Sequence, residues 1–122
     1  MAKILLVDYN EDVSKPVAEY LSWFGFTVDL IHDSSGVLEM LKKTKYDLII
    51  MDRFSVPDDG CSVCKAIRKV PALAEQKIML VAPEEPELAE FMLLKKMGVY
   101  FMNKYGEASL WSEKIATILR KG

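Results

Sequence analysis

Hydrophobic residues are concentrated in five short runs along the chain, and longer stretches of mixed polarity separate these runs. Three of the runs are almost continuous in isoleucine, valine and leucine. Such runs are typical of strands that are buried on both faces of a parallel sheet. The predicted strands are Ile4–Val7, Val28–Ile31, Leu48–Met51, Ile78–Ala82 and Val99–Met102.

The stretches between the runs repeat their apolar residues with the period of a helix. In the first stretch, Gly25 is a common kind of helix stop and follows four suitably spaced apolar residues, Val13, Val17, Leu21 and Phe24. We expect Pro16 to delay the start of this helix and to place Ser14 near its N-cap. The other predicted helices span about residues 37–43, 61–67, 86–95 and 110–119.

Strands that alternate with helices favour an α/β fold built from five βα units. Right-handed crossovers would place helices on both faces of a doubly wound parallel sheet. We expect the strand order 2-1-3-4-5, in which the first and third strands are neighbours. In such sheets, binding sites form beyond the carboxyl ends of the strands, where the strand order reverses.

Charged residues follow three of the predicted strands, at the edge where such a site would form. Asp8 follows the first strand, Asp52 the third and Lys104 the fifth. Two carboxylates and one fixed cation suit a divalent cation and a phosphoryl group, because Mg²⁺ binds through one or two carboxylates together with water and phosphate. A carboxylate can also accept a phosphoryl group itself. For any one aspartate taken alone, a helix N-cap is an equally good interpretation.

Composition and charge narrow the possible partners. The chain has 122 residues, of which 51% are hydrophobic, and its net charge is −2. We expect a single domain over residues 1–122 without an attached effector. The lack of a basic block argues against nucleic acid as a partner. No apolar run approaches the ~20 residues that span a bilayer, and the N-terminus does not resemble a signal peptide, so we expect a cytoplasmic protein with no membrane partner.

Four segments together resemble the receiver domain of two-component response regulators, of the CheY type. KILLVD (3–8) is similar to the first strand and its acid, and DLIIMD (47–52), with Gly60 following, to the phospho-acceptor strand. CSVCKAIRKVPALAEQKIMLVA (61–82) resembles the third helix through the fourth strand, and MGVYFMNK (97–104) the fifth strand with its lysine. The resemblance covers the whole chain, and it implies a flavodoxin-like fold and a role in phosphorelay signal transduction.

The resemblance also implies roles for individual residues. Asp52 would be the phosphorylated aspartate, and Lys104 would pair first with Asp52 and then with the phosphoryl oxygens. Asp8 and Asp52 would hold Mg²⁺ together with the backbone carbonyl of Phe54. Phe101 lies at the position of the aromatic switch residue of the family.

The chain departs from the family pattern at three further positions. Tyr9 stands where the family has a second acid that contacts the metal, and a phenol with a pKa of about 10 is a poor Mg²⁺ ligand. Asn10 or Glu11 is the alternative ligand. Val81 replaces a Ser or Thr whose hydroxyl binds the phosphoryl group, and Tyr105 replaces the proline after the lysine. We therefore expect weak Mg²⁺ binding in an atypical receiver or a pseudo-receiver.

Two functions within signalling remain open at this point. A phosphorylatable receiver would take a phosphoryl group from a sensor histidine kinase, whereas a phosphorylation-independent module would bind another signalling protein. Neither function is that of an enzyme with substrate turnover. In both, the resemblance implies that partners bind the face formed by the fourth helix, the fifth strand and the fifth helix.

Two cysteines suggest an alternative function outside signalling. Cys61 and Cys64 form a CxxC sequence at the start of a predicted helix, which is typical of a thiol-redox module. The competing interpretation is that both are small packing residues on one face of that helix, because they are three residues apart.

Overall fold

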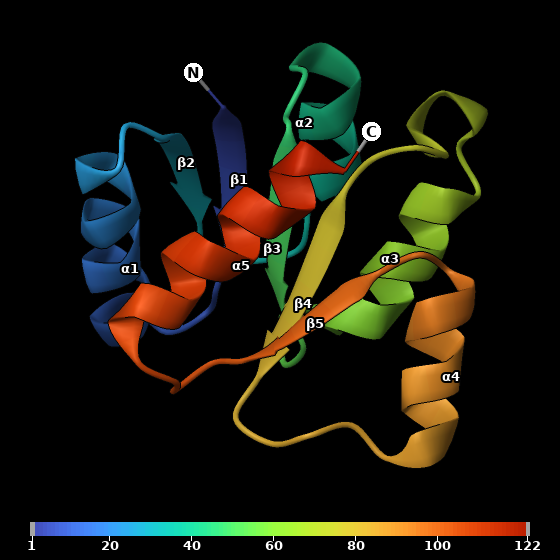
Figure 1. The fold of residues 1–122 in the computed structure, drawn as a ribbon. Coiled ribbons are helices and arrows are strands. Elements are labelled where there is room, and N and C mark those ends of the chain that lie inside the picture. The colour runs from blue at the N-terminus through green and yellow to red at the C-terminus, as the bar shows by residue number, and fades with distance from the viewer. Residues whose placement is uncertain (1, 122) are drawn as a thin grey trace.

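Five parallel strands form one sheet, in the order β2-β1-β3-β4-β5, in the computed structural model of the chain, which describes residues 2–121. The strands are β1 (Lys3–Val7), β2 (Thr27–Ile31), β3 (Leu48–Asp52), β4 (Ile78–Ala82) and β5 (Tyr100–Asn103). The helices are α1 (Glu11–Trp23), α2 (Val37–Lys43), α3 (Gly60–Arg68), α4 (Leu88–Lys96) and α5 (Ala108–Arg120), with a short 3-10 helix, η1 (Pro71–Leu73). Figure 1 shows these elements, which confirm the expected doubly wound α/β fold and strand order.

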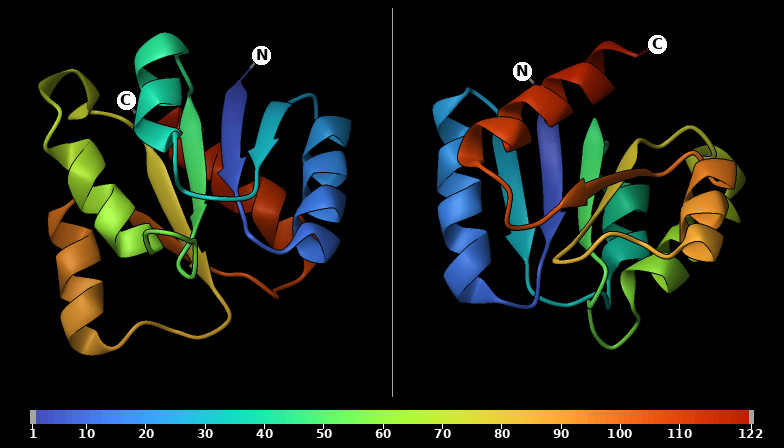
Figure 2. Two further views of the ribbon diagram at one scale, coloured as in Figure 1. Left: turned by 180° about the vertical axis from the view of Figure 1, so that it is seen from behind. Right: turned by 60° about the horizontal axis from the view of Figure 1, so that its bottom comes forward.

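Different helices cover the two faces of the sheet. Successive side chains of a strand point to opposite faces, so Leu5 of β1 lies in one core cluster and Ile4 and Leu6 in the other. Helices α2, α3 and α4 cover the first face, and α1 and α5 cover the second (Figure 2). Every residue of β3 and β4 is buried as a result. Within residues 2–121, none of the helices is long and apolar enough to cross a bilayer.

Helix α1 begins earlier than the sequence predicts, and the expected late start at Ser14 is wrong. Asn10 is the N-cap, and its side chain accepts a hydrogen bond of 3.0 Å from the backbone N–H of Asp12. Glu11 and Asp12 lie in the first turn, where negative side chains stabilise a helix by interacting with the positive end of its dipole. Pro16 lies inside the helix, although proline has no backbone N–H to donate to the preceding turn. The cap at Asn10 and the acidic first turn therefore determine where the helix begins.

The fifth strand begins at Tyr100, one residue later than predicted. Gly98 has a φ of 68°, the left-handed conformation that commonly ends a helix. The backbone N–H of Val99 then donates to the carbonyl of Leu94 on α4 over 2.9 Å. The backbone of Val99 is therefore bonded to the last turn of α4, and β5 begins at the next residue.

The sheet brings the ends of its central strands to one edge. β1 pairs directly with β3, and β4 separates β3 from β5. Ala82 and Asn103 lie opposite each other at the ends of β4 and β5. Asp8 directly follows β1, Asp52 ends β3, and Lys104 directly follows β5. Three charged residues that are distant in the sequence thus share one edge.

Gly60 packs the start of α3 closely against the end of β3. A Cβ atom at this position would lie 2.7 Å from the backbone oxygen of Asp52 and 2.9 Å from Cα of Arg53. The backbone N–H of Gly60 donates to the carbonyl of Arg53 over 2.9 Å. A glycine is therefore needed here for close approach of two backbone segments.

We expect Gly60→Ala to lower the free energy of unfolding by about 1–3 kcal/mol, because the added methyl group meets backbone atoms that cannot rotate away. Gly106→Ala is the matched control, since its Cβ would lie 3.2 Å from Cδ1 of Leu110, the tip of a flexible exposed side chain. Urea-induced unfolding of both variants measures the difference. Small and equal effects would contradict a close contact between α3 and the end of β3.

Candidate functional site

The structure brings together the three charged residues that follow β1, β3 and β5. Lys104 Nζ lies 3.2 Å from Asp8 Oδ1 and 3.1 Å from Asp8 Oδ2. The same ammonium group donates a hydrogen bond to Asp52 Oδ2. All three residues are buried, and Asp52 has an exposed fraction of 0%. One lysine therefore joins two carboxylates inside the protein.

Backbone N–H groups hold each carboxylate in place from the loop that follows its strand. The N–H of Asn10 donates to Asp8 Oδ1 over 2.9 Å. The N–H of Phe54 donates to Asp52 Oδ1 over 2.7 Å. Both are bonds from a residue two positions further on, the pattern by which aspartate fixes a turn. The carboxylates are thus oriented by their own loops as well as by Lys104.

The charges of this cluster do not cancel, because two ionised carboxylates and one ammonium group sum to 1 − 2 = −1. Burial raises the pKa of Asp8 above its ordinary 3.8, although the Asn10 N–H and Lys104 act in the opposite direction. Burial alone would lower the pKa of Lys104, but its bonds to Asp52 and Asp8 raise the pKa above 10.5. Lys104 therefore stays charged at neutral pH, and the cluster retains a negative charge that another cation can neutralise.

The side chains at this edge fit a weakly held Mg²⁺. Asp8 and Asp52 provide the two carboxylates that such a site commonly uses, together with water. The phenol of Tyr9 adds no anionic ligand. Within the part of the chain that the structure describes, no group of three or more His, Cys, Asp and Glu side chains is arranged to hold a metal ion.

The two alternative ligands named from the sequence have other partners. The side chain of Asn10 caps α1 through the N–H of Asp12. Glu11 Oε1 lies 3.0 Å from His32 Nε2, and His32 Nδ1 lies 3.2 Å from the backbone oxygen of Asp8. In this structure, both side chains are therefore engaged in contacts other than with Asp8 or Asp52.

Val81 and Phe101, for which the resemblance implies a role in switching, lie on neighbouring strands. Val81 lies opposite Asp52 in the pairing of β3 with β4, and it is buried. Its side chain has no hydrogen-bond donor, so it cannot bind a phosphoryl oxygen on Asp52. Phe101 lies on β5 and is half-buried against the core on the side of α4.

An ion pair that the sequence does not reveal connects the loop after β3 with α4. Arg53, the residue after Asp52, places Nη2 2.5 Å from Oε2 of Glu90 on α4. The other carboxylate oxygen of Glu90 is buried without a hydrogen-bond partner. No spacing rule relates residues 53 and 90, so only the fold shows that the loop after Asp52 is linked to this helix.

The two cysteines lie on α3, close to its start. Both are free thiols. Burial raises the pKa of Cys61 above its ordinary 9.0 and raises that of Cys64 to about 12. The thiolate is the reactive form of cysteine, and raised pKa values keep both thiols protonated. The contacts of Cys64 are those of a core residue, which agrees with the packing interpretation and gives no support to a thiol-redox module.

Most of the chain matches one known protein family. Residues 4–112 match the response regulator receiver domain. Response regulator MprA of Mycobacterium ulcerans is 35% identical over 66 residues, which are 54% of this chain and 28% of that protein. The probable transcriptional regulator ycf29 of Porphyra purpurea is 29% identical over 106 residues, or 87% of this chain and 48% of that protein. The chain thus spans about half the length, or less, of these curated relatives.

Solved structures with the same fold cover nearly the whole chain. A two-component response regulator from Clostridium difficile has a TM-score of 0.86 at 24% identity, covering 99% of this chain and 98% of that one. The chemotaxis protein CheY4 of Vibrio cholerae has a TM-score of 0.87 at 22% identity, covering 97% and 98%. These likenesses establish the fold.

We expect Asp8→Asn to raise the free energy of unfolding by about 1 kcal/mol at neutral pH in metal-free buffer, because the asparagine removes a buried charge that is not fully compensated. Its side-chain oxygen can still accept from the Asn10 N–H, and Asp52 still pairs with Lys104. Since folding raises the pKa of Asp8 above 3.8, the wild type loses stability as the pH rises from 3.8 through the folded-state pKa. The difference in free energy of unfolding between Asp8→Asn and the wild type therefore grows between pH 3.8 and the folded-state pKa of Asp8, and it is constant at higher pH.

Urea unfolding at a series of pH values from acid to neutral measures this advantage. Glu84→Gln is the control, because Glu84 is an exposed acid. If Asp8→Asn instead destabilises the protein at neutral pH, the attraction between Asp8 and Lys104 exceeds the cost of burying the carboxylate.

Proposed function

The chain belongs to the family of response regulator receiver domains, the signalling modules of two-component systems, and we propose that Asp52 is its phospho-acceptor. The observation that carries this proposal is the bond between Lys104 and Asp52 at the ends of β5 and β3. A cation held beside an acceptor carboxylate is positioned to receive the charge of an incoming phosphoryl group. The retained pair of Asp8 and Lys104 supports the same role.

In the proposed reaction, a carboxylate oxygen of Asp52 attacks the phosphorus of a phosphorylated donor. The new O–P bond forms as the bond between phosphorus and the donor atom breaks, and the leaving group keeps the electron pair. For a sensor histidine kinase the leaving group is the imidazole of its phosphohistidine. Lys104 then shifts part of its hydrogen bonding from the carboxylate to the phosphoryl oxygens, because a charged donor binds phosphate strongly.

Receiver domains of this family typically bind Mg²⁺ at the phosphorylation site, and we propose that Asp8, Asp52 and the backbone carbonyl of Phe54 hold it here. When bound, this ion supplies positive charge that offsets the charge of the phosphoryl group. The excess negative charge of the buried cluster supports such a site. We propose that the affinity is low, because Tyr9 provides no carboxylate.

A second candidate function is that of a phosphorylation-independent interaction module. Two observations favour it: Asp52 is completely buried, and Val81, its neighbour on β4, cannot bind a phosphoryl oxygen. In this alternative, the charged cluster serves the stability of the domain, and the partner recognises the same surface in every state of Asp52.

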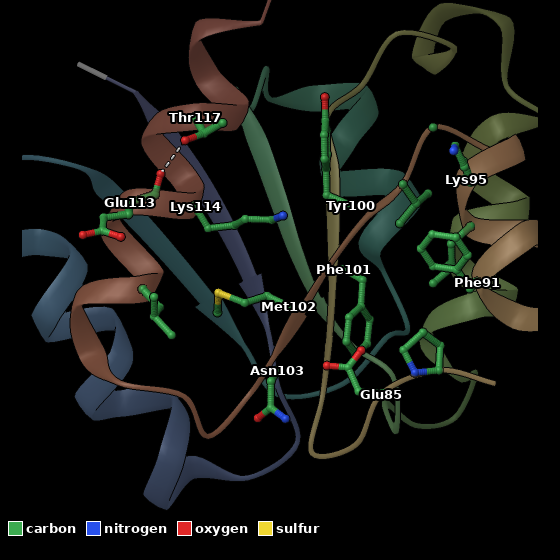
Figure 3. Close-up of a pocket in the computed structure, with 15 residues that line it drawn as sticks. Glu85, Phe91, Lys95, Tyr100, Phe101, Met102, Asn103, Glu113, Lys114 and Thr117 are labelled. Carbon is green, nitrogen blue, oxygen red and sulfur yellow. Dashed lines mark hydrogen bonds between the residues drawn. The ribbon is translucent and has the colours of Figure 1, made fainter. Parts of the chain in front are cut away.

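We propose that a signalling partner docks on the face formed by α4, β5 and α5. A groove of about 890 Å³ lies between α4 and α5 over β5 (Figure 3). Phe101 and Met102 contribute from β5, and the partly exposed Phe91 contributes from α4. Lys95 of α4 and Glu113 of α5 add charged groups to the lining. An apolar centre with charged neighbours suits the surface of a protein partner, which both candidate functions require.

Incubation with Mg²⁺ and acetyl phosphate tests the acceptor directly. We expect intact-mass measurement to show one added phosphoryl group in the wild type and none in Asp52→Asn, with labelling that rises with Mg²⁺ without saturating. Asp58→Asn, a change of a nearby exposed acid, is the control and should be labelled normally. An unlabelled wild type would favour the interaction module, and labelling that persists in Asp52→Asn would assign the acceptor to another residue.

We expect the response of the fold to phosphorylation to be small, because Val81 forms no contact that distinguishes two states of the protein. The missing charge-assisted hydrogen bond corresponds to roughly 1.5–3 kcal/mol, or about a ten- to hundredfold change in the population ratio. Amide chemical shifts of β4, α4 and β5 with and without beryllofluoride measure the response. Val81→Thr should enlarge it, and equal, large shifts around Phe101 in both proteins would show that the switch runs without the hydroxyl.

A further inference from the structure

Two aromatic rings flank the ammonium group of Lys104. Lys104 Nζ lies 5.2 Å from the centroid of the Tyr9 ring and 5.9 Å from that of the Tyr105 ring. Both distances are within the range in which a cation is attracted by the face of a ring. Tyr9 and Tyr105 are two of the positions at which this chain departs from its family, so the two departures meet at one atom.

The backbone on each side places these rings independently. Tyr9 lies between Asp8, whose N–H donates to Ile31 on β2 over 3.1 Å, and Asn10, which both bonds to Asp8 and caps α1. The ring of Tyr9 is therefore attached to a short turn that is fixed at both ends. Its position beside Lys104 is a property of the fold as well as of the contact itself.

Tyr105 is fixed from the end of β5. The backbone N–H of Lys104 donates to the carbonyl of Ala82 over 2.8 Å, which continues the pairing of β5 with β4. The N–H of Tyr105 then donates to Asn103 Oδ1 over 2.9 Å, and Asn103 Nδ2 donates to the carbonyl of Pro83 over 3.1 Å. These bonds fix the turn after β5, and the ring of Tyr105 lies near the ammonium group of Lys104, the residue before it.

Burial shows which groups are inside and which are outside. The side chain of Lys104 has an exposed fraction of 2%, whereas Tyr9 and Tyr105 are exposed to 48% and 61%. The cation is thus buried between two carboxylates, while the two rings beside it lie at the surface. An ammonium group that has lost its water is attracted more strongly by aromatic rings than one in solution.

We propose that Tyr9 and Tyr105 are positioning residues that act through Lys104, holding its ammonium group on Asp8 and Asp52 and thereby closing the acceptor in the resting protein. Asp52 Oδ2 is occupied by Lys104, and no part of Asp52 is exposed. A phosphoryl donor that approaches Asp52 Oδ2 has to displace Lys104 from that oxygen, and Lys104 then turns toward the incoming phosphoryl group. Each ring opposes that movement, so this receiver accepts a phosphoryl group more slowly than its charged residues alone would allow.

The positioning of Lys104 can be measured in the resting protein. Protons on the Cε atom of Lys104 should resonate upfield, because Cε is bonded to Nζ, which lies over both rings. We expect Tyr9→Leu and Tyr105→Leu each to reduce this upfield shift, and Tyr9→Phe and Tyr105→Phe to preserve it, because phenylalanine keeps the ring and removes only the hydroxyl. Trp23→Leu removes an aromatic residue that is 90% exposed on α1 and is the control for general effects on the fold.

The closing of the acceptor is measured by the initial rate of labelling of Asp52 by acetyl phosphate. Each leucine variant should be labelled roughly two- to fivefold faster than the wild type, which is the factor expected for one weak cation–π contact, since both rings are themselves exposed and keep part of their water. The phenylalanine variants should keep the wild-type rate. A purely structural role for the rings would change the thermal stability of the leucine variants without changing the ratio between the leucine and phenylalanine rates.

The possible outcomes distinguish this inference from the proposed function. The slower labelling of Asp52 rests on the proposed function, whereas the positioning of Lys104 does not. Unchanged Lys104 resonances in the leucine variants would overturn the positioning role. Changed resonances with a labelling rate that falls or stays at the wild-type level would overturn the closing of the acceptor. If no protein is labelled at Asp52, the proposed function fails and the closing of an acceptor fails with it, while the resonances still decide whether the rings position Lys104.

Discussion

One ammonium group, that of Lys104, binds two buried carboxylates at the ends of two other strands. Asp8 and Lys104 are 96 residues apart in the sequence, and β3 and β4 lie between β1 and β5 in the sheet. The contact between Asp8 and Lys104 therefore requires these four strands to be paired. Buried charges without a partner are costly, so the carboxylates are stable in this position only when the sheet brings Lys104 to them.

Val81 limits what the proposed site can transmit. It lies opposite Asp52 on β4 and offers no hydrogen bond to a phosphoryl group there, so under the proposed function this position carries no signal away from Asp52. The ion pair between Arg53 and Glu90 connects the loop after β3 to α4 by a separate route. Because α4 also lines the groove on which we propose that a signalling partner docks, this ion pair links the loop after β3 to that surface.

Most of the fold could be predicted because its elements are encoded locally. Continuous apolar runs specified the strands, and the alternation with helices specified a doubly wound sheet. The errors occurred where two local signals compete. Pro16 suggested a late start for α1, but the cap at Asn10 prevailed, and Val99 looked like strand but bonds to the end of α4 after Gly98. Boundaries are decided by individual hydrogen bonds, which composition does not show.

The charged groups at the ends of the strands could be identified from the sequence alone, because strand position and residue identity are both local. Their partners became evident only in the folded chain: Lys104 bonds to both carboxylates at once, the ring of Tyr9 lies near the lysine, and Arg53 reaches Glu90. These contacts join residues from different elements, and their distances depend on how the strands are aligned and how the loops turn. Such distances between residues of different elements are set when the chain folds, and no periodic pattern along the sequence predicts them.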